Sequence, residues 1–164
     1  MPACRMTVAA FFLTLALVLT GAEAPTTAEG APITATKADK CPVCGMFVAK
    51  YPDFLAQIVF TDGSHALFDG CKDMFKYYLD FKKYNAAKNL ADIAAIQVTD
   101  YYSMMPIDGR TAWYVVGSDV FGPMGRELIP FQQETDAQEF MKDHSGKKLL
   151  RFTEITPELM KGLE

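Results

Sequence analysis

The chain has 164 residues, of which 50% are hydrophobic and 22% are charged. This balance supports one domain, or two very small units with a shared core, and it is atypical of a largely disordered chain. The formal net charge is -4, and Lys and Arg are scattered without a basic stripe, so we expect no nucleic-acid partner.

The N-terminus has the pattern of an export signal. Arg5 precedes an uncharged apolar run at residues 7–20, which is short for a membrane span but typical of the hydrophobic segment of a signal peptide. Small residues follow, and cleavage after Ala22 avoids leaving Pro25 first in the mature chain. We therefore predict a signal peptide at residues 1–22 and a periplasmic or exported protein. The alternative is an uncleaved N-terminal anchor, the case in which we expect contact with a membrane.

Residues 23–40 are rich in Ala, Thr and Pro, which predicts a flexible tether ahead of a fold that begins near Lys40. Cys4 is removed with the signal, and three cysteines remain. An odd number of thiols in an exported protein leaves at least one outside any intramolecular disulfide. A bound soft metal is one way to protect such a thiol from oxidation.

Residues 41–100 predict a first unit with the order strand, strand, helix, strand. The expected elements lie at residues 55–60, 65–68, 69–84 and 93–99. Asp62 and Gly63 are typical of a tight hairpin turn between two strands. Asp69 is expected to cap the helix, whose apolar residues recur at helical spacing on one face. A second short helix is predicted at residues 86–90.

Residues 101–164 repeat this order. The expected elements lie at residues 111–117, 127–131, 135–145 and 149–155, with a short terminal helix after Thr156. Residues 122–125 (GPMG) form the hairpin turn, and Thr135 with Gln138 matches a capping box. The pattern predicts an α+β fold of two small ββαβ units that share a core. A single irregular α+β domain is the alternative.

Cys41 and Cys44, in the segment 41–46 (CPVCGM), can converge on one ion or on each other. A haem attachment site requires His after the second Cys, where this chain has Gly45. A structural zinc site requires four ligands, and the remaining Cys and His residues lack paired spacing. A thioredoxin-like pair opens a helix after a strand, whereas this pair follows a tether. A redox pair and a plain disulfide remain alternatives.

Copper(I) makes fewer demands, because it is soft, binds thiolate and thioether, and is held by two or three ligands. If residues 44–48 are extended, Cys44 and Met46 point to the same side, and both sulfurs can reach one ion. Met124 lies in the Gly-Pro-Met-Gly turn, which cannot lie deep in a core without leaving its backbone groups unsatisfied. Met124 is therefore a candidate thioether donor.

His65 and Cys71 are candidates for a second soft-metal site. Cys71 lies on the apolar face of the predicted helix, which favours a buried thiol. It also lies in the first turn, where the helix dipole favours a thiolate. His65 begins the returning strand of the hairpin, where a solvated side chain is the alternative.

Three segments resemble the NosL-type copper accessory proteins of nitrous oxide reductase. They are residues 41–46 (CPVCGM), the hairpin with Phe68-Asp69, and residues 121–131 (FGPMGRELIPF). The resemblance covers residues 41–155. It implies a periplasmic copper(I) chaperone, rather than an enzyme, and two ββαβ units similar to part of the organomercurial lyases.

The same resemblance implies that Cys44 and Met124 are the copper ligands, with Met46 or His65 assisting. The implied partner is a periplasmic acceptor such as nitrous oxide reductase, or its maturation transporter. The competing functions are a thiol-disulfide oxidoreductase or another heavy-metal protein that uses Cys41 and Cys44, a mercury-carbon lyase, and a structural module with a plain disulfide. Phosphate-binding glycine loops, nucleophile elbows and paired His-Glu zinc motifs are absent from the sequence.

Overall fold

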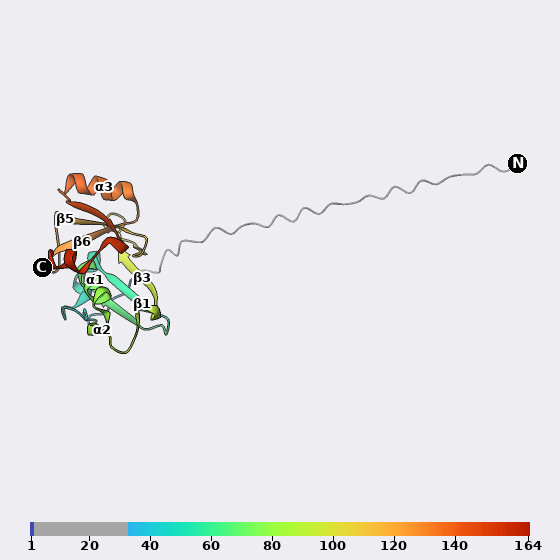
Figure 1. Cartoon of the computed structure of the whole chain (residues 1–164), viewed down its shortest axis with the longest axis horizontal. Coiled ribbons are helices and arrows are strands. Elements are labelled where there is room, and N and C mark those ends of the chain that lie inside the picture. Colours follow the sequence, from blue (N-terminus) through green and yellow to red (C-terminus); the bar gives the residue numbers. More distant parts are fainter. Residues whose placement is uncertain (2–32) are drawn as a thin grey trace.

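Two antiparallel sheets and the helices packed on them form the part of the chain that the structure, a computed structural model, describes: Met1 and residues 33–164 (Figure 1). The predicted signal peptide, Cys4 and most of the predicted tether lie outside the described residues. Among the helices of the described part, none is long and apolar enough to cross a membrane.

The first sheet has four strands in the order β2-β1-β3-β4. They are β1 (Ala56–Phe60), β2 (His65–Phe68), β3 (Ile93–Thr99) and β4 (Pro106–Asp108). The predicted hairpin turn is confirmed: Gly63 has a φ of +82°, and a carboxylate oxygen of Asp62 accepts a hydrogen bond from the Ser64 amide at 3.0 Å. Helix α1 (Cys71–Leu79) follows β2, and the short helix α2 (Phe81–Tyr84) comes directly after it.

The second sheet has three strands in the order β6-β5-β7. They are β5 (Trp113–Gly122), β6 (Gly125–Phe131) and β7 (Lys148–Arg151). Helix α3 (Glu134–Asp143) packs on this sheet, and the terminal helix α4 (Pro157–Lys161) packs against α1. Helix α1 contacts β1 and β2 of the first sheet and β6 of the second, so it lies between the two sheets (Figure 1).

The element order confirms the predicted fold class, because strand, strand, helix, strand occurs twice: β1-β2-α1-β3 and β5-β6-α3-β7. Strand β4 was not predicted. It follows residue 100, where the sequence divides the two units, and it pairs with β3 of the first sheet. The register joins Val98 to Ile107 and Thr99 to Pro106.

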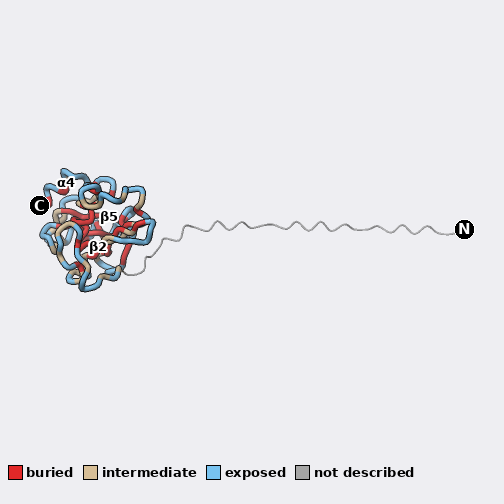
Figure 2. Tube along the Cα trace, turned by 90° about the horizontal axis from the view of Figure 1, so that it is seen from below, coloured by how far each residue is buried: buried red, intermediate tan, exposed pale blue. Residues whose placement is uncertain are grey.

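One core is shared by both units, and the buried residues run through the middle of the folded part (Figure 2). Strand β5 is buried on both faces, because successive side chains of a strand point to opposite sides. Tyr114 and Val116 join the main core around α1, whereas Val115 joins a smaller cluster beneath α3. Phe75 of α1 packs edge-on against Tyr114, with ring centroids 5.1 Å apart.

Two predicted elements were wrong. In each, an acidic side chain accepts a hydrogen bond from the backbone amide three residues earlier. The helix expected at residues 86–90 is a turn followed by a 3-10 helix (Leu90–Asp92), in which the Asp92 carboxylate accepts from the Asn89 amide at 2.7 Å. The last strand ends at Arg151, whose amide donates to the Glu154 carboxylate at 2.7 Å. A 3-10 helix (Phe152–Glu154) replaces the rest of that strand. Such local bonds compete with regular secondary structure.

The predicted capping box at Thr135 and Gln138 is also absent. Helix α3 begins after Gln133, without a side-chain cap, and the Gln138 amide instead donates to the Glu134 carboxylate at 2.9 Å. This bond joins residues four apart on one helix face, which is the usual spacing of helix side-chain pairs.

Candidate metal centre

A tight turn places the two thiols of the Cys-Pro-Val-Cys segment. The Gly45 amide donates to the Cys41 carbonyl at 2.9 Å, and the Cys41 amide donates to the Met46 carbonyl at 2.9 Å. Gly45 has a φ of +78°, a conformation in which a residue without Cβ meets no steric penalty. The expectation of extended backbone at residues 44–48 was therefore wrong. The chain reverses there and continues as a 3-10 helix (Val48–Lys50).

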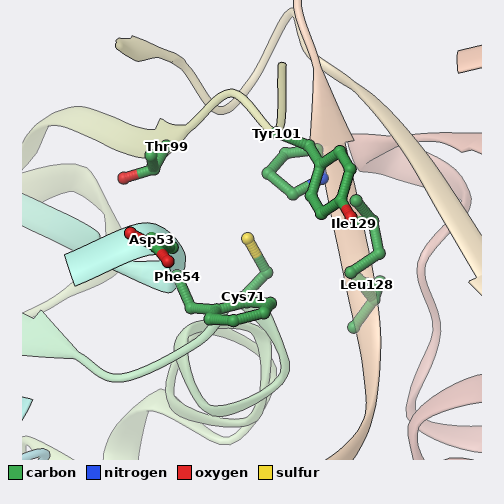
Figure 3. A pocket seen from close by; sticks show the side chains of 8 residues that line it. Asp53, Phe54, Cys71, Thr99, Tyr101, Leu128 and Ile129 are labelled. Carbon is green, nitrogen blue, oxygen red and sulfur yellow. The ribbon is translucent and has the colours of Figure 1, made fainter. Parts of the chain in front are cut away.

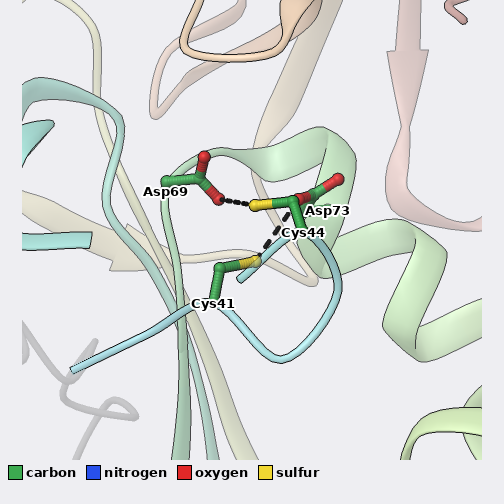
Figure 4. Close-up of side chains that lie close together, drawn as sticks. All are labelled: Cys41, Cys44, Asp69 and Asp73. Atoms are coloured by element: carbon green, nitrogen blue, oxygen red, sulfur yellow. Dashed lines mark hydrogen bonds between the residues drawn. The ribbon is translucent and has the colours of Figure 1, made fainter. Parts of the chain in front are cut away.

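The start of α1 supplies two carboxyl groups beside this turn. Asp69 was expected to cap the helix, but Gly70 is the N-cap residue and no side chain caps the helix from that position. Asp69 is therefore free to point at the cysteines, as Figure 4 shows. Asp73 lies in the first turn of α1, where the positive end of the helix dipole favours a carboxylate.

Four side chains from these two segments converge (Figure 4). The Cys41 thiol donates to Oδ2 of Asp73 at 3.3 Å, and the Cys44 thiol donates to Oδ1 of Asp69 at 3.3 Å. The four ligand atoms all lie within 4.8 Å of one another. Two sulfurs on opposite sides of an ion, each about 2.3 Å from it, lie about 4.6 Å apart, so small side-chain movements suffice to bring these atoms to one ion.

One buried oxygen of this cluster lacks a hydrogen-bond partner among the residues that the structure describes. Asp69 is only 1% exposed, and its Oδ2 has no hydrogen-bond partner within the described residues. A buried polar atom without a partner costs roughly 1–3 kcal/mol. A cation in the cluster would remove that cost, so the unpartnered oxygen fits a metal site better than a set of closed hydrogen bonds.

Burial keeps both thiols protonated at neutral pH. It raises the pKa of Cys44 to about 12, and the neighbouring Asp73 adds to the shift. Burial also raises the pKa of Cys41 well above its ordinary range, again with a contribution from Asp73. A metal that binds thiolates here must therefore displace their protons.

Cys71 and His65 are not brought together, and neither belongs to the cluster of four. Cys71 is buried, and its thiol points into a separate small cavity between the sheets, lined also by Thr99 and Tyr101 (Figure 3). His65 is exposed at the start of β2 and lines a surface groove of about 320 Å³ with Lys40 and other residues. The two residues of the predicted second site therefore line different cavities.

The main-chain carbonyls of Met46 and Met124 each accept a hydrogen bond from a segment that carries a cluster residue. Met46 is half-buried, and its carbonyl accepts the amide of Cys41. Met124 is 42% exposed at the tip of the β5-β6 hairpin, as the turn predicted. Its carbonyl accepts a hydrogen bond from Nζ of Lys72, the residue before Asp73. The second unit therefore contacts the first turn of α1, the turn that also carries Asp73.

Asp69 and Asp73 are candidate site residues that the sequence analysis did not assign to the metal. Their spacing, i and i+4 around the start of a predicted helix, places two carboxyl groups on one helix face. That spacing, in the segment 69–73 (DGCKD), was the available signal.

The chain is similar to proteins whose names refer to copper. The sequence model of the NosL family matches residues 32–160. The copper-binding lipoprotein NosL of Stutzerimonas stutzeri is 30% identical over 131 residues, which cover 79% of this chain and 68% of that protein. The crystal structure of the copper chaperone NosL from Shewanella denitrificans is similar with a TM-score of 0.67 and 26% identity, covering 79% of this chain and 98% of that one.

Proposed function

Because the chain belongs to the NosL family, we propose that it is an exported copper carrier that takes up copper(I) at the Cys41-Cys44 turn and passes it to an acceptor outside the cytoplasm. The names of its relatives support copper binding: one is a copper-binding lipoprotein and another is a copper chaperone. The lipoprotein also supports an envelope location for this chain. Export by residues 1–22, and the monovalent state of the copper, belong to the proposal.

The observation that carries the proposal is the buried cluster of two thiols and two carboxyl groups with one unpartnered oxygen. Copper(I) is soft and is satisfied by two or three ligands, so Cys41 and Cys44 can form the centre of its site. The carboxyl groups of Asp69 and Asp73 accept the thiol protons in hydrogen bonds before the ion arrives.

A carrier explains the thiols better than a redox enzyme does. A thiol-disulfide oxidoreductase needs a thiolate at neutral pH, and its reactive Cys has a lowered pKa. Here burial raises the pKa of Cys44 to about 12. The free thiols of Cys41 and Cys44 are therefore poor nucleophiles until a metal displaces their protons.

We propose nitrous oxide reductase, or its maturation transporter, as the acceptor. A carrier site must release its ion by exchanging ligands one at a time with an incoming protein. Cys44 is less buried than Cys41, so an incoming sulfur would reach the ion on the Cys44 side.

Native mass spectrometry of the reduced protein tests the carrier function. We expect one copper per chain after titration with copper(I), and loss of that copper in Cys44→Ser. A metal-free chain lighter than the reduced form by two hydrogens would instead support a disulfide. N-terminal sequencing of the protein recovered from the envelope and cytoplasmic fractions tests export. A soluble cytoplasmic protein that begins at Met1 would contradict it.

Competition between copper(I) and zinc(II) tests the choice of metal. The two sulfurs and two oxygens are also a donor set that zinc(II) accepts in tetrahedral geometry. We expect copper(I) to displace zinc(II) at neutral pH, because thiolates select the softer ion. If zinc(II) competed evenly with copper(I), the result would support a structural metal site instead of a carrier site.

A further inference from the structure

Two ionisable residues outside the cluster are buried without forming a simple ion pair. Lys72 of α1 and Glu127 of β6 are each 3% exposed. Nζ of Lys72 donates to the carbonyls of Met124 and Leu163, and Glu127 bonds to backbone amides. Burying a charged group is costly unless its surroundings compensate for the lost water. Such a placement needs a reason.

Glu127 caps α1 from the second unit. Its Oε1 accepts the backbone amides of Lys72, at 2.5 Å, and of Leu128, at 2.9 Å. Helix α1 has no side-chain cap of its own, so Glu127 supplies an acceptor for an amide that the helix leaves unsatisfied. The carboxyl group therefore fixes β6 against the first turn of the helix that carries Asp73.

Glycines make this close approach feasible on both sides. A Cβ at Gly122 would lie 2.9 Å from Oε2 of Glu127, and a Cβ at Gly70 would overlap the same oxygen. Gly70 belongs to the start of α1, and Gly122 belongs to the end of β5. The hairpin and the helix thus meet around one carboxyl group.

Lys72 fixes the tip of the same hairpin. Its ammonium group donates to the main-chain carbonyl of Met124, three residues before Glu127. The Met124 backbone is therefore held at the end of the Lys72 side chain, which comes from the first turn of α1. Its side chain remains 42% exposed, so the thioether is not consumed by core packing.

We propose that Lys72 and Glu127 are positioning residues that hold the Met124 turn against the start of α1, so that the Met124 thioether completes the copper site from the second unit. This inference rests on the function proposed above. Neither residue is a metal ligand: each bonds to the backbone, and its effect on the ion passes through Met124. The site is then closed by both ββαβ units, although the cluster of four belongs to the first.

Lys72→Leu tests the proposal, because it removes the donor to the Met124 carbonyl and adds no sulfur that could itself bind copper(I). Copper(I) affinity is measured by chelator competition, and X-ray absorption counts the sulfur atoms around the ion. We expect a fall in affinity of roughly 10–100-fold, as for other residues that orient metal ligands, and one fewer sulfur. Lys76→Leu is the matched control, since Lys76 lies one turn later and pairs with Glu164 at 3.0 Å.

The double variant Lys72→Leu/Met124→Ala separates positioning from a general loss of structure. If Lys72 acts through Met124, the double variant binds copper(I) as weakly as Met124→Ala alone. Additive losses, or an unchanged sulfur count in Lys72→Leu, would overturn the inference. If Lys72→Leu does not fold, as judged by circular dichroism of the metal-free protein, Lys72→Gln, whose shorter side chain cannot span the same distance, takes its place.

The wild-type protein distinguishes the two hypotheses. Failure of the wild type to bind copper(I) contradicts the proposed function itself. Copper(I) binding by the wild type that is unaffected in Met124→Ala leaves the carrier function intact and contradicts only the positioning role of Lys72 and Glu127.

Discussion

At the scale of single residues, protonation links the cysteines to the metal. Burial raises the pKa of Cys44 to about 12 and raises that of Cys41 further, so both thiols carry protons at pH 6–8 in the metal-free protein. Each cysteine that binds an ion as a thiolate must then release its thiol proton. Metal affinity should therefore rise with pH.

The slope of the logarithm of the association constant against pH gives the number of thiolate ligands. If both cysteines bind, the copper(I) association constant should rise about 100-fold per pH unit between pH 6 and 8, and about tenfold in Cys41→Ser. Chelator competition at several pH values, corrected for protonation of the chelator, measures both slopes. A tenfold slope in the wild type would mean that only one cysteine binds as a thiolate, and the family resemblance implies that this is Cys44.

The carboxyl groups should affect metal choice more than copper affinity. Asp69→Asn and Asp73→Asn keep the size of the side chain but replace a hard anionic donor. Zinc(II) accepts carboxylate oxygen readily, whereas copper(I) prefers sulfur, so both variants should lose more affinity for zinc(II) than for copper(I). Parallel titrations with the two ions measure the ratio. Asp53→Asn, at an exposed residue outside the cluster, is the control.

Sequence reasoning found the thiol half of this site and missed the carboxyl half. Cys41 and Cys44 were identified from their spacing alone, because two thiols so close in sequence can hardly avoid sharing an environment. Asp69 and Asp73 lie more than twenty residues away, and only the packing of α1 against the turn brings them there. Long-range packing of this kind leaves little trace in one sequence.

At the scale of elements, the turn at Gly45 determines where the thiols lie. Gly45 has a φ of +78°, and a Cβ there would meet no atom within 4 Å. Gly45→Ala should therefore destabilise the protein by about 1–2 kcal/mol through backbone strain alone. If the strain is relieved by a change in the turn, the thiols separate and copper(I) affinity falls.

Gly63→Ala is a matched control for this prediction. Gly63 has a φ of +82°, also has free space around a Cβ, and lies in the β1-β2 turn. We expect a similar loss in the free energy of unfolding, measured with urea, but no change in copper(I) affinity. Equal effects of the two substitutions on affinity would show that the Gly45 turn has no special role.

The elements that the sequence predicted best are those with a complete local signal. Strands β2 and β3 have the predicted bounds, and the Asp62-Gly63 turn joins β1 to β2 as expected. The errors at Asn89 and Arg151 arose where a single carboxylate, three residues later, bonds to the backbone. Hydrophobic periodicity does not report such bonds.

At the scale of the whole molecule, Glu127 joins the two units through a buried carboxyl group. Burial raises its pKa from 4.5 to about 8, although the amides of Leu128 and Lys72 and the charge of Lys72 oppose this. Between these two pH values the unfolded chain has released the proton and the folded protein still holds it. Stability should therefore decrease as pH rises from 5 to 8.

Glu127→Gln should remove this part of the pH dependence, because the amide is neutral at every pH and its Oε1 can still accept the two backbone amides. We expect the wild type to lose on the order of 3 kcal/mol in the free energy of unfolding between pH 5 and 8, and Glu127→Gln to lose less. The raised pKa values of Cys41 and Cys44 act only above pH 9, outside this window. Urea unfolding of the metal-free protein at each pH, with Glu139→Gln on exposed α3 surface as the control, measures the difference. Parallel curves for wild type and Glu127→Gln would mean that Glu127 is ionised in the folded protein, and that the two units meet around a charge rather than a neutral acid.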